Sequence, residues 1–434
     1  MSYQEQPAPI SETEQIPRLT DTLRPVPITG AALLTKLAFR GEDLDSLLSA
    51  YQDRIDGPPD DAGVVLDMST ILQLAFNREP ALEMQSNAIA QQQIFRVAGN
   101  KGIGPETTSP PRLRVLALVA PGDLMVNTPL EFILSASDIR LDLLYLIPGR
   151  PLPTEIPDHD VAFVAVSEPD LHAATLQRLR RLVAAWPRPI VNDPSRILLL
   201  SRESVYSLLN DLPGVTIPLT LRIRRTELEQ LVRGEMPPLP EGDRFDYPIL
   251  VRPVGSHAGN ELRKLDDPEA LSRYLATTPQ SEFYLMPFID YRGTAGMYRK
   301  LRVVFIQGAP YLCHMAVSEN WMIHYLNAGM TESADKRAEE AAAMKDFDAD
   351  FATRHSAALR AVSDRLGLDY FGIDCGETRD GRLLVFEADV AMVIHDMDPP
   401  DLFPYKGPQM RKVFRAFEGM LESIARAKGK GAER

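Results

Sequence analysis

The sequence predicts a chain of mixed α/β and α+β class, in which helical hairpins precede a small parallel α/β domain and a larger unit of mixed strands and helices. Three observations lead to this prediction. Apolar residues recur at helical spacing up to residue 98. Between 112 and 192, continuous apolar runs alternate with helical stripes. Beyond 193, short apolar runs follow one another around glycine-bearing turns.

Composition and charge limit the classes of function that this protein can have. Among 434 residues, 44% are apolar and 25% are charged, which is typical of a folded globular chain. The formal charge of −13 disfavours a general nucleic-acid binder, because neutralising phosphates needs a basic surface. Two cysteines, Cys313 and Cys375, are too few for a disulfide framework and indicate a reducing compartment. With no apolar run long enough to cross a bilayer, we expect a cytoplasmic protein that binds neither nucleic acid nor membrane.

The N-terminal part divides into an arm and a helical region. Residues 1–30 are rich in Pro, Glu and Gln without periodicity, and we expect a mobile arm. Residues 31–98 are expected to be helical and contain an internal echo, in which the segment at 37–42 resembles the segment at 74–79. The echo resembles tetratricopeptide-type hairpins, although a helical cap without repeat ancestry explains it equally well. Such helices predict a protein or peptide partner, or a homodimer interface.

A parallel α/β domain is expected over residues 112–192, after a linker at 99–111. The apolar run from Arg114 to Ala120 ends at a Pro-Gly pair, as a buried parallel strand does, and further strands are expected at 141–147 and 161–166. A helical stripe over 171–186 follows the third strand. Strands that alternate with helices predict a parallel sheet.

Strands and helices are mixed beyond this domain, and a basic tail follows at 426–434. A charged, alanine-rich stretch over 331–350 is expected to be a solvated helix or a mobile loop. The expected strands lie at 247–251, 283–289, 301–306, 370–374 and 383–387, and the expected helices at 204–209, 357–366 and near the C-terminus.

Three carboxylates are expected to meet where two of these strands approach each other. Asp374 ends one strand, Gly381 turns the chain, and Glu387 and Asp389 share one face of the returning strand because side chains alternate with a period of two. Converging carboxylates are costly to bury unless a cation neutralises them, and oxygen ligands of this kind suit Mg²⁺. Solvated acids at strand ends explain the isolated motif equally well.

A second pattern is typical of a phosphate-binding loop. The strand at 247–251 leads to Arg252 and then to a loop with Gly255, Ser256 and Gly259. Glycine permits close backbone approach, and successive N–H groups can cradle a phosphate beside the arginine charge. An ordinary glycine-bearing hairpin explains this segment alone at least as well.

A third pattern is an apolar strand that leads into a linker, over Phe283–Asp290. A purine pairs with such a hinge through one backbone C=O and an N–H two residues later, which predicts Met286 and Phe288. Pro287 between them loses nothing there, because its missing N–H is not needed. When the segment is viewed alone, an ordinary core strand is the favoured interpretation.

The order of these parts resembles the ATP-grasp superfamily and is most similar to its glutathione-synthetase-like branch, which includes peptide and ribosomal-protein glutamate ligases. The resemblance covers about 112–425, and its most specific matches are Tyr370–Asp374 and Val385–Asp389. It implies two subdomains, at 193–290 and 291–425, that hold ATP between antiparallel sheets, with Mg²⁺ or Mn²⁺. It also implies a reaction in which a carboxylate becomes an acyl phosphate that an amine attacks to give an amide.

The resemblance also implies roles for single residues. Arg252 takes the position of a phosphate-contacting lysine, and Arg202 lies near an earlier family lysine. Arg302 falls beside the transferring phosphoryl group, and Arg299 would hold a substrate carboxylate, although a structural salt bridge explains Arg299 equally well. The implied nucleotide-binding residues are Arg202, Arg252, Gly255, Ser256, Gly259, Met286, Phe288 and Asp290, and the implied metal ligands are Asp374, Glu387 and Asp389.

These features favour an ATP-dependent ligase that joins a small-molecule or peptide carboxylate to an amine. Two departures keep alternatives open, because the family commonly has lysine at the position of Arg252 and asparagine at that of Asp389. The first alternative is a non-catalytic ATP-binding module that recruits partners through its N-terminal helices. The second is a small-molecule kinase on the same fold.

Overall fold

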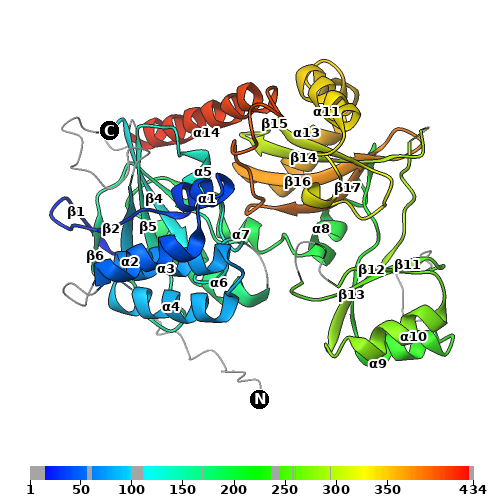
Figure 1. The fold of residues 1–434 in the computed structure, drawn as a ribbon, viewed down its shortest axis with the longest axis horizontal. Helices are drawn as coiled ribbons and strands as arrows, with labels where there is room; N and C mark the ends of the chain where they lie inside the picture. Colours follow the sequence, from blue (N-terminus) through cyan, green and yellow to red (C-terminus); the bar gives the residue numbers. More distant parts are fainter. Residues whose placement is uncertain are drawn as a thin grey trace.

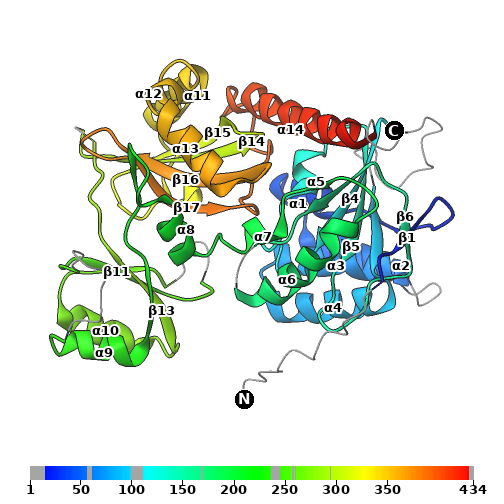
Figure 2. The same cartoon turned by 180° about the vertical axis from the view of Figure 1, so that it is seen from behind.

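The computed structural model describes residues 15–55, 61–98, 111–167, 170–235, 245–256, 259, 261–293 and 295–429. The N-terminal half of the chain forms one unit and the C-terminal half a second unit beside it (Figure 1). A long helix, α14 (Lys406–Gly429), runs from the second unit across the first, and its C-terminal end lies over the N-terminal unit in both views (Figures 1 and 2).

A six-stranded sheet forms the core of the first unit, in the order β2-β3-β5-β4-β7-β8. Neighbouring strands are parallel, except that β3 and β5 are antiparallel. This arrangement confirms the expected parallel sheet, whose apolar runs bury both of its faces. The strands are β2 (Val26–Ile28), β3 (Ile94–Val97), β4 (Leu113–Val119), β5 (Ile139–Tyr145), β7 (Val161–Val164) and β8 (Ile190–Val191).

Strands near the N-terminus correct the expected arm. β1 (Arg18–Thr20) pairs with β6 (Glu155–Pro157), and β2 joins the edge of the main sheet. The mobile arm is therefore wrong for these two segments, because three-residue strands are too short to show a periodicity. Residues 1–14 of the arm, 99–110 of the expected linker and 430–434 of the expected tail lie outside the described residues.

Helices cover both faces of the six-stranded sheet. Leu66 of α3 shares a core with Val115 and Ala117 on one face, whereas Leu116 of the alternate face packs with Leu176 of α6. Helices are present in the expected helical region as far as Gln91, but its last part is wrong, because Ile94–Val97 form the strand β3. The helices therefore lie between β2 and β3 and belong to this sheet. The partner or homodimer interface on these helices stays a prediction. The helices are α1 (Ala31–Phe39), α2 (Leu44–Ile55), α3 (Ala62–Leu74), α4 (Arg78–Gln91), α5 (Leu130–Ile133) and α6 (Ala173–Leu182), with short 3-10 turns at Asp170–His172 and Val183–Ala185.

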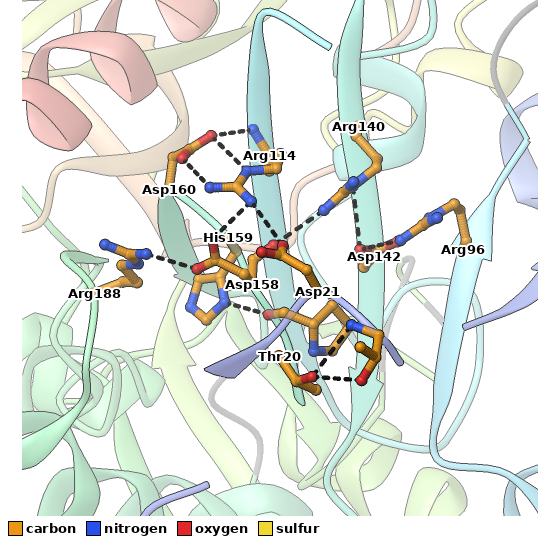
Figure 3. Close-up of polar contacts among 12 residues, drawn as sticks. Thr20, Asp21, Arg96, Arg114, Arg140, Asp142, Asp158, His159, Asp160 and Arg188 are labelled. Atoms are coloured by element: carbon orange, nitrogen blue, oxygen red, sulfur yellow. Dashed lines mark hydrogen bonds and ion pairs between the residues drawn. The ribbon is translucent and has the colours of Figure 1, made fainter. Parts of the chain in front are cut away.

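A network of ion pairs crosses the ends of these strands (Figure 3). Arg114 Nη1 lies 2.7 Å from Asp158 Oδ2, and its Nη2 lies 2.8 Å from Asp160 Oδ1. Next to it, Asp142 is 2% exposed and lies 2.7 Å from Arg96 of β3. Since charged groups that are buried without partners cost several kcal/mol, these pairs fix the order of strands from β3 to β7. Asp21, Arg140 and Arg188 extend the network.

The second unit contains two sheets that face each other between outer helices (Figure 1). A four-stranded antiparallel sheet has the order β10-β13-β11-β12, and a five-stranded sheet has the order β15-β14-β16-β17-β9. This agrees with the expected pair of antiparallel sheets, except that the short edge strand β9 pairs parallel with β17. The first sheet contains β10 (Leu221–Arg224), β11 (Ile249–Pro253), β12 (Arg263–Leu265) and β13 (Glu282–Pro287), with α9 (Arg225–Val232) and α10 (Pro268–Thr277). The second contains β9 (Val215–Thr216), β14 (Tyr298–Ile306), β15 (Ala309–Ser318), β16 (Tyr370–Glu377) and β17 (Leu383–Asp389), with α7 (Pro194–Ile197), α8 (Arg202–Leu209), a 3-10 turn at Tyr325–Asn327, α11 (Ala334–Asp346), α12 (Phe351–Arg354) and α13 (Ser356–Leu366).

Helix α14 joins the two units through a shared apolar core. Phe417 is fully buried, and its ring lies 5.7 Å from Phe163 of β7 and 5.1 Å from Tyr370 of β16. A buried phenylalanine of this kind contributes about 3–5 kcal/mol relative to alanine. Between the units, Asn192 Nδ2 donates to the carbonyl of Tyr370 at 2.8 Å. The parallel sheet and the five-stranded sheet therefore pack as one body.

Among the helices of the described ranges, none combines the length and the apolar character that a membrane crossing requires.

Glu131 predicts a pH dependence of stability. Its carboxylate lies at the N-terminus of α1, where burial raises its pKa from 4.5 to about 7, against hydrogen bonds from the Ala31 and Ala32 amides and with help from Asp67. The folded state therefore binds this proton more tightly, and its contribution to stability is lost as the pH rises from about 4.5 to about 7, on the order of 3 kcal/mol. Urea denaturation measures the free energy of unfolding at pH 5 and pH 8. Relative to the wild type, Glu131→Gln should be more stable at pH 8 than at pH 5. An equal difference at both pH values would contradict this.

Phe76 predicts a stabilising substitution. The amide of Phe76 donates to Gln73 O at 3.0 Å and that of Asn77 to Leu72 O at 2.9 Å, so Phe76 occupies the left-handed position that ends α3, with φ of 62°. Glycine is preferred there, as in α1, where Gly41 has φ of 82°. Phe76→Gly should raise the free energy of unfolding by about 1 kcal/mol, whereas Gly41→Ala should lower it by about as much. Loss of stability in Phe76→Gly would count against this account.

Candidate functional site

Charged side chains gather on the face of the five-stranded sheet that is turned toward the four-stranded sheet. Asp374 of β16 lies directly opposite Arg302 of β14 on one side and Glu387 of β17 on the other. Asp389 lies two residues beyond Glu387 and so shares its face. The three acids therefore lie on one face, as the sequence predicts.

Asp374 is a buried carboxylate held by two cations. It is 1% exposed, and its Oδ1 lies 2.8 Å from Arg302 Nε, while its Oδ2 lies 2.8 Å from Lys300 Nζ and 3.0 Å from Arg302 Nη2. Burial alone would raise the pKa of Asp374, but Arg302 and Lys300 outweigh burial and hold the pKa well below its usual range. Arg302 Nη1 also donates to the Val393 carbonyl at 3.0 Å, so this guanidinium is fixed in place.

A second pair of cations approaches from α8 and the four-stranded sheet. Arg202 Nη2 donates to Glu387 Oε2, and the opposing effects of burial and of Arg202 leave the pKa of Glu387 lowered. Arg252 of β11 is 5% exposed. Burial and the neighbouring Arg202 charge lower the pKa of Arg252 to about 10. Arg252 is therefore a buried cation whose charge is not fully neutralised by a neighbouring carboxylate.

The glycine-bearing loop folds back on Arg252. Arg252 Nε donates to Ser256 Oγ at 3.0 Å, and Ser256 Oγ donates to the Pro253 carbonyl at 2.8 Å. Gly255 and Gly259 have φ of 77° and 74°, a conformation that only glycine adopts without strain. The loop therefore needs its glycines for its path, and its Ser256 is brought beside the cations.

Taken together, four cations face three carboxylates at this site. The cations come from α8, β11 and β14, and so from both sheets. Of the acids, Asp389 has no cation in hydrogen-bond contact among the described residues, and its burial raises its pKa to about 6. A positive surplus in a buried setting is suited to bind an anion such as a phosphate. The positive side chains are Arg202, Arg252, Lys300 and Arg302.

The three acids do not form the expected magnesium site. Both oxygens of Asp374 contact cations, Oε2 of Glu387 accepts from Arg202, and Oδ1 of Asp389 accepts from the Ala391 N–H at 3.0 Å. Across the part of the chain that the structure describes, no group of three or more His, Cys, Asp or Glu side chains is placed to hold a metal ion. In this arrangement lysine and arginine neutralise the acids, and the donor set does not fit a divalent cation.

The hinge strand differs from the prediction by one residue. The amide of Phe288 donates to the Pro248 carbonyl at 3.1 Å, and Met286 pairs with Leu250 of β11. Because backbone groups in an antiparallel ladder alternate in direction, Met286 and Phe288 both point toward β11. The backbone N–H and C=O groups of Met286 and Phe288 are therefore directed at β11. A purine would have to pair with the backbone groups of Pro287 and Ile289 instead.

Two predicted residues lie away from the cation cluster. Arg299 points to the opposite face of β14 from Lys300 and Arg302, where its Nη2 lies 3.2 Å from Glu339 Oε2. Asp290 contacts Arg292 Nε at 2.9 Å and Arg379 Nη2 at 2.8 Å, and the hydrogen bond from Arg292 is the largest cause of its pKa of about 2. The structure therefore places Arg299 and Asp290 in ion pairs outside the site.

Lys300 is a site residue that the sequence interpretation missed. A signal was present, because a lysine two residues before Arg302 on a strand must share its face. Glu340, within the charged stretch at 331–350, carried no such signal. It is fully buried and accepts hydrogen bonds from Tyr325 Oη at 2.9 Å and Tyr405 Oη at 2.6 Å, with Lys406 Nζ at 3.6 Å from its other oxygen. The segment at 331–350 therefore forms the helix α11, and its buried Glu340 bonds the helix to the rest of the unit.

Known proteins resemble this chain only distantly. No protein-family model and no curated protein matches the sequence. A solved RimK domain protein ATP-grasp from Sphaerobacter thermophilus is 17% identical, with 72% of this chain and 99% of that chain covered and a TM-score of 0.40. The VanG D-Ala:D-Ser ligase from Enterococcus faecalis is 12% identical, with 71% and 99% covered and a TM-score of 0.44. The D-alanine-D-alanine ligase from Coxiella burnetii is 10% identical, with 73% and 98% covered and a TM-score of 0.44.

Removal of the Asp374 carboxylate should destabilise the fold. Asp374→Ala leaves Lys300 and Arg302 without their negative partner, which should cost about 3–5 kcal/mol in the free energy of unfolding. Adding Lys300→Met should recover part of this loss, because it removes one of the unpaired charges. Urea denaturation measures both, and Asp364→Ala on the exposed face of α13 serves as a control expected within about 0.5 kcal/mol of the wild type. Full additivity of the two substitutions would refute the coupling.

Proposed function

We propose that this protein is an ATP-dependent carboxylate–amine ligase. The observation that carries the proposal is the buried positive surplus between the two sheets. There Arg252 is 5% exposed and donates to Ser256, with no carboxylate in ion-pair contact among the described residues. A triphosphate supplies the missing negative charge, and the loop with Gly255 and Ser256 lies beside Arg252 to receive it. The motif order from Arg252 to Asp389 supports the same assignment.

In the proposed reaction, a carboxylate oxygen of the first substrate attacks the γ-phosphorus of ATP, and the bond to the bridging oxygen breaks to release ADP. The amine of the second substrate then attacks the acyl carbon, inorganic phosphate leaves, and the amine nitrogen loses a proton to solvent. Arg302 is fixed by Asp374 and Val393, so its guanidinium would stabilise the charge of the transferring phosphoryl group without reorganisation. No step is assigned to Mg²⁺, because in this arrangement Arg202, Lys300 and Arg302 occupy oxygens of Glu387 and Asp374.

A non-catalytic nucleotide-binding module is the second candidate. One observation favours it, namely that Asp374 is engaged by Lys300 and Arg302 and is not available as a metal ligand. A module of this kind would bind ATP at the same cations but would not release ADP. A small-molecule kinase would release ADP but leave a stable phosphorylated product.

The test is ADP release by the purified full-length chain with a carboxylate, ATP, Mg²⁺ and hydroxylamine. A ligase forms a hydroxamate, because hydroxylamine captures the acyl phosphate, whereas a kinase releases ADP without hydroxamate and a binding module releases neither. Arg302→Gln should lower the rate by about 10²–10³-fold.

Arg299→Gln is the matched control, because Arg299 lies on the same strand but on its opposite face. Its rate should stay close to that of the wild type, with circular dichroism confirming that both variants fold. Equal rates in Arg302→Gln and the wild type would remove Arg302 from the site.

A further inference from the structure

Lys300 contacts the carboxylate that was expected to hold a metal ion. Its Nζ lies 2.8 Å from Asp374 Oδ2, and its side chain is 18% exposed, so the ammonium is enclosed but still accessible from the site. Asp374 is 1% exposed, and a carboxylate buried to this degree needs a cation beside it. Lys300 and Arg302 supply that charge. The interaction that a divalent cation would make with Asp374 is therefore already made by the chain.

The Lys300 ammonium has donors to spare, unlike the guanidinium beside it. An ammonium carries three N–H groups, and within the described ranges the contact with Asp374 is the single hydrogen bond of Lys300 Nζ. Each nitrogen of Arg302 has a partner, since Nε and Nη2 donate to Asp374 and Nη1 donates to the Val393 carbonyl. Across β15, Lys300 pairs with Ala316, whose side chain offers no competing acceptor. Two N–H groups of Lys300 are therefore available to an anion while the Asp374 contact stays intact.

A cation with one carboxylate contact and open positions can do what magnesium does in a phosphate site. Mg²⁺ is usually held by one or two carboxylates and contacts phosphate oxygens with other positions. Lysine also binds phosphate, as a point charge with N–H donors. Lys300 is thus suited to bridge the Asp374 carboxylate and a phosphate oxygen, which is the bridge that the metal would otherwise form.

The positive surplus of the site depends on Lys300. Four cations face the three carboxylates, and without Lys300 the two kinds of charge would be equal in number. A cluster without surplus would need a divalent cation to attract a polyanion, because the attraction follows the net local charge. Lys300 removes that need. The cations are Arg202, Arg252, Lys300 and Arg302, and the carboxylates are those of Asp374, Glu387 and Asp389.

We propose that Lys300 takes the place of a divalent cation in this site, so that the chain binds the polyphosphate of a nucleotide without Mg²⁺. This proposal rests on the proposed function and concerns the same site. Lys300 keeps its contact with Asp374 and donates its other N–H groups to phosphate oxygens, while Arg252 contacts the polyphosphate from β11. No covalent bond forms or breaks in this binding step.

The first test is isothermal titration calorimetry of ATP with the full-length chain, once in EDTA and once in excess Mg²⁺. The two Kd values of the wild type should agree within about threefold. In EDTA, Lys300→Met should weaken ATP binding by about 10–100-fold, because it removes charge-assisted hydrogen bonds to phosphate. Lys412→Met is the matched control, because Lys412 is 49% exposed on α14, and its Kd should equal that of the wild type.

The second test probes the acids without nucleotide, by titration with Mn²⁺ followed by electron paramagnetic resonance. The wild type should leave Mn²⁺ free in solution. Lys300→Glu places a further carboxylate beside Asp374, and adjacent like charges need a cation, so this variant should bind Mn²⁺. Lys300→Met removes the lysine without adding a ligand and should bind Mn²⁺ more weakly than Lys300→Glu. Circular dichroism melts with and without Mn²⁺ show whether each variant folds.

The outcomes separate this proposal from the proposed function. The proposal is overturned if Mg²⁺ tightens ATP binding by the wild type more than about tenfold, or if Lys300→Met binds ATP as the wild type does in EDTA. Binding of Mn²⁺ by the wild type also overturns it, whether or not ATP binds. Equal ATP binding in both buffers without ADP release from any acid keeps the proposal and rejects the ligase. Binding of ATP in neither buffer rejects the proposed function and the nucleotide, and Mn²⁺ binding confined to the Lys300 variants would then support Lys300 as the internal cation alone.

Discussion

The charge balance around Asp374 is the constraint on which the site depends. This carboxylate is buried at the centre of the five-stranded sheet, and two cations on β14 satisfy both of its oxygens. Its neighbour Glu387 is satisfied by Arg202 from α8, which leaves Arg252 as the buried cation with an incomplete partner. Because burying an unpaired charge is costly, each of these groups restricts the others to one geometry. The result is a local positive surplus inside a chain whose net charge is −13.

The N-terminal helices take part in the same body. They lie between two strands of the six-stranded sheet, and α3 and α4 hold the loop after β4 through Gln73 and Arg78. That loop in turn reaches the second unit through Thr128 and the Val390 carbonyl. Helix α14 closes the arrangement from the other side, with Phe417 packed between rings of both units. The position of the loop after β4 relative to the cations is therefore set by packing that extends over most of the described chain.

Periodicity predicted the parallel sheet and the shared face of Asp374 and Glu387, because these features depend on patterns local to each strand. The two antiparallel sheets and the approach of Arg252 and Arg302 to these acids were implied by the family resemblance. The strands β1 and β2 were missed, since three residues are too few to display a period. Lys300 was overlooked although its spacing from Arg302 placed it on the same face. Of the two interpretations of Arg299, the structure agrees with the salt bridge, because neighbouring residues on a strand point to opposite faces and Arg299 meets Glu339. The partners of Glu340, Tyr325 and Tyr405, lie 15 and 65 positions away in the sequence, and no local pattern predicts such a contact.

Competition for the cations limits what can bind at the site. An anion that draws Arg302 and Lys300 toward itself does so at the expense of Asp374, which would be left as a buried carboxylate without a partner. Leaving one member of a buried pair unsatisfied costs about 3–5 kcal/mol, so an anion with a single charge gains little by displacing Asp374. A polyanion can instead contact Arg252, whose partner is incomplete, and share Arg302 through a donor that Asp374 does not use. The geometry therefore favours long, multiply charged anions over short ones. Only a ligand that spans from β11 to β14 reaches both Arg252 and Arg302 while the ion pairs of Asp374 stay intact.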